Sequence, residues 1–299
     1  MSIILETRLP LALVHRGKVR DNYSLNGQLL IVATDRISAF DSVLPCGIPH
    51  KGAVLNLLSA FWFEKTAHLV PNHLLEVVRQ SRQVQSYLPG CQEQELLTNR
   101  AMIVKKAERI PVECIVRGYL SGSAWAEYST GGTIHGIRAP EGLLESQKLA
   151  QPVFTPTTKA DTGHDLPLSL AELADTVGKE TALELKEKSL LIYGFAEEYA
   201  RSRGIIIADT KMEFGFIDGC ISLIDELLTP DSSRFWDTAT YETGKSQASF
   251  DKQMVRDWLV ASGWDKEPPA PPLPQDLVHK TSDRYIEAYV RLTGASFSL

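Results

Sequence analysis

The segment Asp209-Thr-Lys-Met-Glu-Phe-Gly215 places carboxylates and a lysine at alternate positions. It follows an apolar run at 205–208, whose isoleucines predict a buried strand. If the strand continues, Asp209, Lys211 and Glu213 point to one face, because side chains alternate along a strand. Two carboxylates and an ammonium make a poor core but a good site for a divalent metal and phosphate oxygens. The segment therefore suggests phosphoryl chemistry.

The turn that follows decides whether another carboxylate joins this group. The dipeptide at 218–219 is Asp-Gly, a strong hairpin signal, and residues 220–225 form the predicted returning strand. A two-residue turn would place Ile224 opposite Glu213 and turn Asp225 to the other face. A loop that is one residue longer would bring Asp225 to the face of Glu213. A shared acidic cluster therefore predicts the odd-length loop, and the alternative is an exposed hairpin face with paired charges.

A second candidate phosphate contact lies near the start of the chain. Arg16-Gly-Lys-Val-Arg20 places a glycine among cations on a predicted hairpin, which can lay its backbone and Lys18 over nucleotide phosphates. The tripeptide Gly-Lys-Ser at 244–246 is different, because the earlier glycine and the buried strand of a phosphate loop are missing from the sequence before it. We therefore exclude 244–246 as a phosphate site.

Two more turns carry arginine. Arg117 and Ser123 flank a turn of small residues, where backbone N–H groups can cradle a phosphate. Asp231 and Arg234, in Pro-Asp-Ser-Ser-Arg, form a turn with an arginine suited to bidentate binding of phosphate or carboxylate. Both turns are candidate anion sites.

Periodicity and turn residues predict an α+β chain. Strands are expected at 18–23, 29–33, 101–105 and 112–119, with loops and short strands over 131–167. Helices are expected at about 54–68, from a capping box at Ser169 and Glu172, and at about 180–203, 252–262 and 282–293, with a proline-rich connector at 267–274. We divide the chain into a strand-rich N-terminal lobe, residues 1–108, and a mixed lobe, residues 109–299.

Composition narrows the class of protein. The chain has 299 residues, with 43% hydrophobic and 23% charged, as in ordinary globular proteins. A net charge of −6 argues against a general nucleic-acid or membrane binder. We expect neither a signal peptide nor a membrane span. The four cysteines lack metal-type spacing, so we expect reduced thiols and a cytoplasmic protein.

Seven motifs, in order along the chain, together carry a resemblance. They are Gly-Lys-Val-Arg-Asp at 17–21, Thr-Asp-Arg-Ile-Ser-Ala-Phe-Asp at 34–41, Glu-Cys-Ile-Val-Arg-Gly-Tyr-Leu-Ser-Gly-Ser at 113–123, Asp-Thr-Lys-Met-Glu-Phe-Gly at 209–215, Asp-Glu at 225–226, Pro-Asp-Ser-Ser-Arg-Phe-Trp at 230–236 and Ser-Phe-Asp-Lys-Gln at 249–253. In this set the chain resembles the SAICAR synthetase family over almost its whole length.

The resemblance implies an activity and a fold. The family joins L-aspartate to the carboxylate of carboxyaminoimidazole ribonucleotide (CAIR) in purine biosynthesis, with ATP and Mg²⁺. The implied fold has two lobes, a kinase-like antiparallel N-terminal lobe and a mixed α/β lobe, with ATP between them. The chain is similar to the longer form of the family, which implies a monomer.

The resemblance also implies roles for residues. ATP would contact Lys18, Arg20, Met102, Lys105, Lys106, Glu113, Lys211 and Asp225, with adenine on the strand around 102–106. The substrate would contact Asp41, Arg117, Ser123, Asp209, Asp231, Arg234 and Lys252. The implied metal ligands are Glu213 and Asp225, and Lys211 joins them as a catalytic group that bridges nucleotide and substrate.

Two other classes of function share part of this inventory. A small-molecule kinase would use the same metal–lysine cluster but release a phosphorylated acceptor. A non-catalytic nucleotide-binding module would bind ATP without turnover, and the intact Lys211, Glu213 and Asp225 argue against it.

Overall fold

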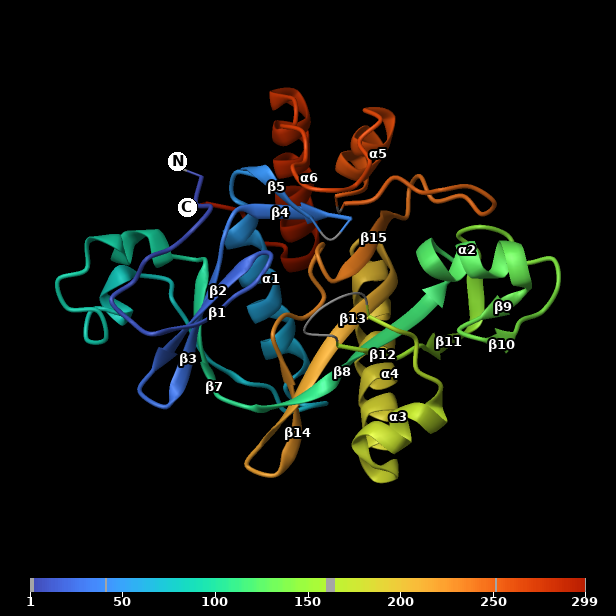
Figure 1. The fold of residues 1–299 in the computed structure, drawn as a ribbon, viewed down its shortest axis with the longest axis horizontal. Helices are drawn as coiled ribbons and strands as arrows, with labels where there is room; N and C mark the ends of the chain where they lie inside the picture. Colours follow the sequence, from blue (N-terminus) through green and yellow to red (C-terminus); the bar gives the residue numbers. More distant parts are fainter. Residues whose placement is uncertain (1–2, 41, 160–164, 251, 299) are drawn as a thin grey trace.

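An antiparallel sheet forms the N-terminal part of the protein in this computed structural model, which describes residues 3–40, 42–159, 165–250 and 252–298 (Figure 1). Its strand order is β1-β2-β3-β7-β6. The bounds are β1 (Leu13–Arg16), β2 (Arg20–Leu25), β3 (Gln28–Ala33), β7 (Ala101–Lys105) and β6 (Leu74–Val77). The β2–β3 turn at Asn26 and Gly27 has positive φ at both residues, as a tight two-residue hairpin requires.

A second antiparallel sheet crosses the middle of the molecule (Figure 1). Its two long strands, β8 (Glu108–Tyr119) and β13 (Ile205–Ile217), lie side by side. The flanking strands are β11 (Lys148–Phe154) and β12 (Thr157–Thr158) beside β8, and β14 (Cys220–Ile224) and β15 (Ser233–Asp237) beside β13. Two small pairs complete the strands, β4 (Arg36–Ala39) with β5 (Ser42–Gly47), and β9 (Thr133–Ile134) with β10 (Ile137–Arg138).

Helices cover both sheets. They are α1 (Lys51–Thr66), α2 (Gly122–Gly131), α3 (Leu170–Val177), α4 (Lys179–Ser202), α5 (Gln253–Ala261) and α6 (Gln275–Thr293), with 3₁₀ turns η1 (Ser81–Gln83) and η2 (Gln92–Leu97). Met212 and Phe214 of β13 are buried with Ile192 and Ala196 of α4. The other face of β13, which carries Lys211 and Glu213, is thereby left for the site, as the alternation of side chains predicts.

The largest apolar core runs through both sheets. Ile31 of the first sheet and Cys114 and Ile207 of the second belong to one cluster with Val54 and Leu58 of α1. Helix α1 therefore joins the two parts of the protein. The antiparallel sheets and the helices packed on them confirm the predicted α+β class, whereas the division at residue 108 stays a prediction.

Most predicted elements are confirmed, with shifted ends. The capping box opens α3, where the Glu172 N–H donates to Ser169 Oγ at 3.2 Å and the Ser169 N–H to the Glu172 carboxylate at 2.8 Å. Helix α1 starts before residue 54 because a distant carboxylate caps it: the Gly52 N–H donates to Asp35 Oδ1 at 2.9 Å. Helix α6 starts directly after Pro274 and not at 282, since its polar first turns hide the apolar periodicity.

Composition led to expectations about membrane spans and about the cysteines. Within the described ranges, no helix is both long and apolar enough to cross a bilayer. All four cysteines are free thiols, as their spacing predicted.

The proline-rich connector lies between α5 and α6, and its Ala270 and Leu273 are buried against both helices, so it is packed and not a free linker.

A close contact holds α4 against the two long strands. The Tyr193 hydroxyl donates to the Ile207 carbonyl at 2.7 Å. The ring passes directly over Gly118 of β8, where an added Cβ would lie 1.9 Å from the hydroxyl oxygen. Glycine at 118 is therefore required by the packing of the central sheet.

We expect Gly118→Ala to lower the free energy of unfolding by about 1–3 kcal/mol, because the new methyl group overpacks the contact with Tyr193. Gly194→Ala is the matched control. Gly194 lies within α4 with no atom within 4 Å of an added Cβ, so alanine should raise stability by roughly 0.5–1 kcal/mol. Equilibrium denaturant unfolding checks both, and equal midpoints for Gly118→Ala and the parent chain would contradict the packing argument.

Candidate active site

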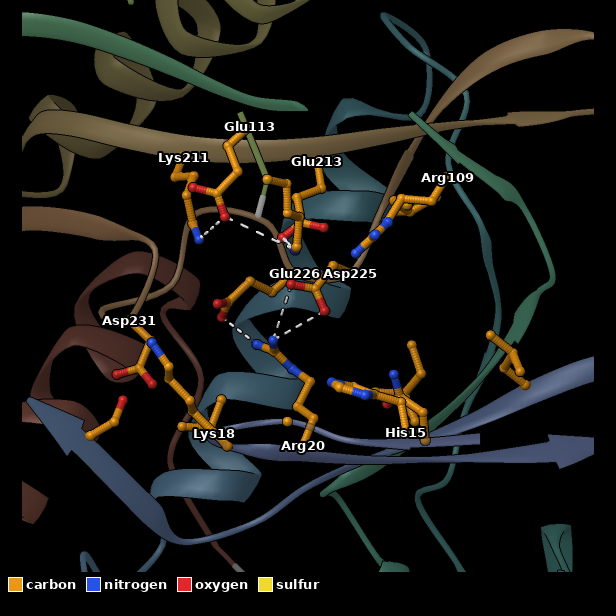
Figure 2. A pocket seen from close by; sticks show the side chains of 18 of the residues that line it. His15, Lys18, Arg20, Arg109, Glu113, Lys211, Glu213, Asp225, Glu226 and Asp231 are labelled. Carbon is orange, nitrogen blue, oxygen red and sulfur yellow. Dashed lines mark hydrogen bonds and ion pairs between the residues drawn. The ribbon is translucent and has the colours of Figure 1, made fainter. Parts of the chain in front are cut away.

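A cleft of about 800 Å³ lies between the two sheets. The β1–β2 loop and the start of β2 line one side, through Lys18 and Arg20, and strand β13 with the end of β14 lines the other (Figure 2). Ile31 of β3 also belongs to the lining. Of the described lining residues, nine are lysine or arginine and six are aspartate or glutamate. The cleft is thus more cationic than the chain as a whole, whose net charge is −6.

The hairpin between β13 and β14 corrects one prediction. Its loop is the two-residue Asp218-Gly219, since Ile217 pairs with Cys220, and Glu213 stands opposite Ile224. The predicted odd-length loop is therefore wrong.

Asp225 nevertheless lines the same cleft as Glu213 (Figure 2). Strand β14 ends at Ile224, and Asp225 adopts a left-handed φ of 63°. That conformation ends the alternation of the strand, so the side chain is not held to the opposite face. The acidic group therefore forms by a backbone turn at Asp225 and not by the length of the loop.

Carboxylates and lysines alternate across β8 and β13. Glu113 and Glu213 stand directly opposite each other, a like-charge pair that is unfavourable without counter-ions. Lys211 Nζ lies 2.6 Å from Glu113 Oε1, and Lys159 forms an ion pair with Glu213. Desolvation lowers the pKa of Lys211, but the two glutamates raise it by more. The net effect is an increase, so this ammonium stays charged.

Arg20 links the β1–β2 loop to the acidic group. Its Nη1 lies 3.2 Å from both oxygens of Asp225, and its Nη2 pairs with Glu226 (Figure 2). Desolvation raises the pKa of Asp225, but Arg20 and two lysines outweigh it and hold that pKa below its usual value. Desolvation and the neighbouring Asp225 raise the pKa of Glu213. Two mutually repelling carboxylates in one cleft are suited to a cation.

The donor set fits a magnesium ion that arrives with a nucleotide. Mg²⁺ takes one or two carboxylates and fills its other positions with water and phosphate oxygens. Glu213 and Asp225 offer two such carboxylates, and Asp225 is close enough to raise the pKa of Glu213. Across the described ranges, no group of three or more His, Cys, Asp or Glu could hold a metal by itself.

A second cluster surrounds Asp209. In the strand register it stands opposite Arg117 of β8 and opposite Arg234 of β15. Arg117 Nη1 lies 3.3 Å from Asp209 Oδ2, Arg234 pairs with the same oxygen, and Arg117 Nη2 donates to Ser123 Oγ at 3.2 Å. The two predicted anion-binding turns therefore meet, and Asp209 keeps their guanidinium groups together.

The predicted residues fall into three groups. Those that line the cleft are Lys18, Arg20, Lys105, Lys106, Glu113, Lys211, Glu213, Asp225, Asp231 and Lys252. Those that form the neighbouring cluster are Arg117, Ser123, Asp209 and Arg234. Met102 is buried in the core between β3 and β6, and the next residues of its strand, from Lys105, reach the cleft. Asp41 lies outside the described residues.

Two cations of the site were missed from the sequence. Lys159 lies in the stretch expected to be loops, and it reaches Glu213 because the two-residue β12 pairs with β8 at Glu113. Lys51 is fully buried at the start of α1, with its Nζ 2.6 Å from Asp231 Oδ2. Neither lysine had a local signal, because the predicted helix began at about residue 54, after Lys51, and Lys159 lay in the stretch expected to be loops.

Comparison with known proteins gives one consistent result. The family model described as SAICAR synthetase matches residues 13–271. The chain is 55% identical over 294 residues to the phosphoribosylaminoimidazole-succinocarboxamide synthase of Thermodesulfovibrio yellowstonii, covering 98% of this chain and 99% of the relative. The enzyme of that name from Geobacter metallireducens is 50% identical over 296 residues, covering 98% of each.

Solved structures agree with the sequence matches. The SAICAR synthase of Saccharomyces cerevisiae complexed with SAICAR is 44% identical, with a TM-score of 0.90, covering 99% of this chain and 100% of the other. A SAICAR synthetase in complex with ADP, at 24% identity, shares the fold, with a TM-score of 0.67 and coverage of 95% and 99%. By its family match, its identity over full length and its fold, this chain belongs to the SAICAR synthetase family.

Proposed function

We propose that this protein ligates L-aspartate to the carboxylate of CAIR, with ATP cleaved to ADP and phosphate, in the synthesis of purine nucleotides. It is an ATP-dependent carbon–nitrogen ligase. The observation that carries this proposal is the cleft of a SAICAR synthetase fold in which Glu213 and Asp225 face Lys211 and Arg20. The yeast relative of the same fold was solved with SAICAR, the product of this ligation.

ATP would bind between the two sheets. Lys18 of the β1–β2 loop and Arg20, the first residue of β2, would contact the phosphates, and the apolar Leu29 and Ile31 of β3 offer a surface for the base. The end of β7, from Lys105, would provide the backbone contacts to adenine, with Met102 supporting that strand from the core. The relative in complex with ADP shares this fold.

Glu213 and Asp225 would hold Mg²⁺ together with phosphate oxygens. The ion would neutralise charge on the transferring phosphoryl group. Lys211, held 2.6 Å from Glu113, would bridge nucleotide and substrate, because its ammonium remains charged and partly exposed in the cleft. Lys159, which pairs with Glu213, adds a further cation at this point.

The ribonucleotide would bind at the arginine cluster. Arg117 and Arg234 provide charge-assisted donors for an anionic group, and Asp209 and Ser123 orient them. Asp231 and Lys252 line the adjoining side of the cleft. We also assign Asp41 to the substrate side, on the family resemblance of its motif.

The chemistry follows from the inertness of a carboxylate. One carboxylate oxygen of CAIR attacks the γ-phosphorus of ATP, and ADP leaves. The neutral amine of L-aspartate then attacks the acyl carbon, phosphate departs with that oxygen, and the amine loses a proton as the amide forms. The cations of the cleft stabilise the transferring phosphoryl group without a covalent adduct to the protein.

We further propose that the protein acts as a cytoplasmic monomer of two lobes, residues 1–108 and 109–299. Its partners are then the small-molecule substrates alone, without nucleic acid or membrane. The acidic net charge and the resemblance of the motifs to the longer form of the family support this proposal.

ADP release should depend on both CAIR and L-aspartate, since the acyl phosphate turns over only when an amine accepts the acyl group. A coupled ADP assay with each substrate omitted in turn measures this. Full ADP release without L-aspartate, together with a phosphorylated acceptor, would instead identify a small-molecule kinase.

Arg234→Ala should raise the KM for CAIR about 10- to 100-fold, because a hydrogen bond to a charged group contributes about 1.5–3 kcal/mol. The KM for ATP should stay near that of the parent. Arg138→Ala, which removes an exposed arginine paired with Glu141, is the control. Equal losses for both substrates would count against the assignment of Arg234.

CAIR labelled with heavy oxygen in its carboxylate should deliver label into inorganic phosphate in step with amide formation. Glu213→Gln should abolish both signals together, because it removes a metal ligand at nearly constant shape. Glu187→Gln, on the exposed face of α4, should leave both intact. Unlabelled phosphate with a normal yield of amide would rule out the acyl-phosphate route.

A further inference from the structure

Lys51 is a charged residue in a place that disfavours charge. Its side chain is 0% exposed, and it is the first residue of α1. The N-terminal end of a helix carries partial positive charge, which repels an ammonium. A second ammonium, that of Lys252, lies 3.8 Å from the carboxylate that Lys51 binds. Burial and Lys252 lower the pKa of Lys51, and Asp231 only partly offsets them.

Asp231 receives a donor on each of its oxygens. Lys51 Nζ lies 2.6 Å from Oδ2, and the Tyr285 hydroxyl donates to Oδ1 at 2.7 Å. Lys51 also lies over the Tyr285 ring, 5.7 Å from its centroid. Lys51, Tyr285 and Asp231 come from α1, α6 and the turn before β15. We call this group the clamp, and it joins segments that are far apart in the sequence.

Stability alone does not account for this clamp. A buried ion pair is commonly no better than well-packed apolar groups, because desolvation offsets the attraction. Here the helix dipole and Lys252 add further repulsion. A clamp that contributes little net stability but constrains both oxygens of a carboxylate is suited to holding that carboxylate in one orientation.

The position of the clamp indicates that its buried residues act on a ligand through Asp231. Asp231 lines the cleft, whereas Lys51 and Tyr285 are fully buried and are not part of the cleft lining within the described residues. Both side chains bind Asp231, so Asp231 connects them to a ligand in the cleft. Lys252 lines the cleft and lies 3.8 Å from Asp231, so its ammonium faces the ligand as well.

We propose that Lys51 and Tyr285 are positioning residues that orient the Asp231 carboxylate toward hydrogen-bond donors of the ribonucleotide. This rests on the proposed function, in which Asp231 binds that substrate. Lys252 and Lys51 together hold the pKa of Asp231 below its usual value and keep it ionised, Lys51 binds one of its oxygens, and Tyr285 sets the rotation of the carboxylate through the other. Together they make Asp231 a pre-oriented acceptor.

Lys51→Met and Tyr285→Phe test the proposal, because positioning of Asp231 should affect the KM for CAIR and not the KM for ATP. Each should raise the KM for CAIR, about 10- to 100-fold for Lys51→Met because it removes a charged bond, and leave the KM for ATP near that of the parent. Lys51→Arg should restore most of the affinity. Lys65→Met, at the far end of α1, and Tyr289→Phe, one turn further along α6, are the matched controls and should leave both constants unchanged.

Tyr285→Phe keeps the test open if Lys51→Met fails to fold, since it removes one hydroxyl from a retained ring. A double-mutant cycle with Asp231→Asn then separates positioning from general structure: the Tyr285 change should have little further effect once the carboxylate is gone. Equal loss for CAIR and ATP, or additive losses in the cycle, would overturn the proposal. The ligase activity of the parent chain is measured first. If the parent chain were inactive, that result would refute the proposed ligase function and not the positioning role.

Discussion

Two glutamates that face each other across the central strands set the constraint on which the site depends. Glu113 of β8 and Glu213 of β13 are directly paired and nearly buried, so their repulsion must be balanced by cations. Lys211 balances the first and Lys159 the second. Because β12 brings Lys159 into place only when it pairs with β8, the charges of the cleft are complete only when the second sheet has formed.

Buried carboxylates elsewhere act as junctions between distant segments. Asp35 accepts the N–H groups of Ile4 and Gly52 at 2.9 Å and pairs with Arg100 at 3.2 Å. It therefore fixes the start of α1 against the first sheet, just as Asp231 joins α1 to α6. The same helix packs in the core shared by both sheets. Polar junctions at its beginning and apolar contacts along its length thus hold the two sides of the cleft in register.

Much of the fold and of the candidate site could be predicted from local patterns. Lys211 and Glu213 share a face as the strand period requires, and the box at Ser169 opens a helix. Features set by distant partners could not be predicted. Asp225 reaches the site through a left-handed backbone conformation. Aspartate tolerates this conformation, but its presence in the sequence does not predict it. Lys159 depends on a two-residue strand. The start of α1 depends on Asp35, which lies 17 residues before Gly52 in the chain, so no local signal encodes it.

The uneven distribution of charge has a consequence for how ligands arrive. Among the described residues that line the cleft, cations outnumber carboxylates, whereas the protein as a whole is acidic. The field around most of the surface therefore repels anions, while this lining attracts them. Nucleotides and a phosphorylated ribonucleotide are therefore steered to one entrance, which raises the rate of productive encounter. Since the screening length falls to roughly 8 Å at physiological ionic strength, this guidance acts only over the last few molecular diameters. Salt should accordingly slow capture of the substrates more than it loosens the bound state.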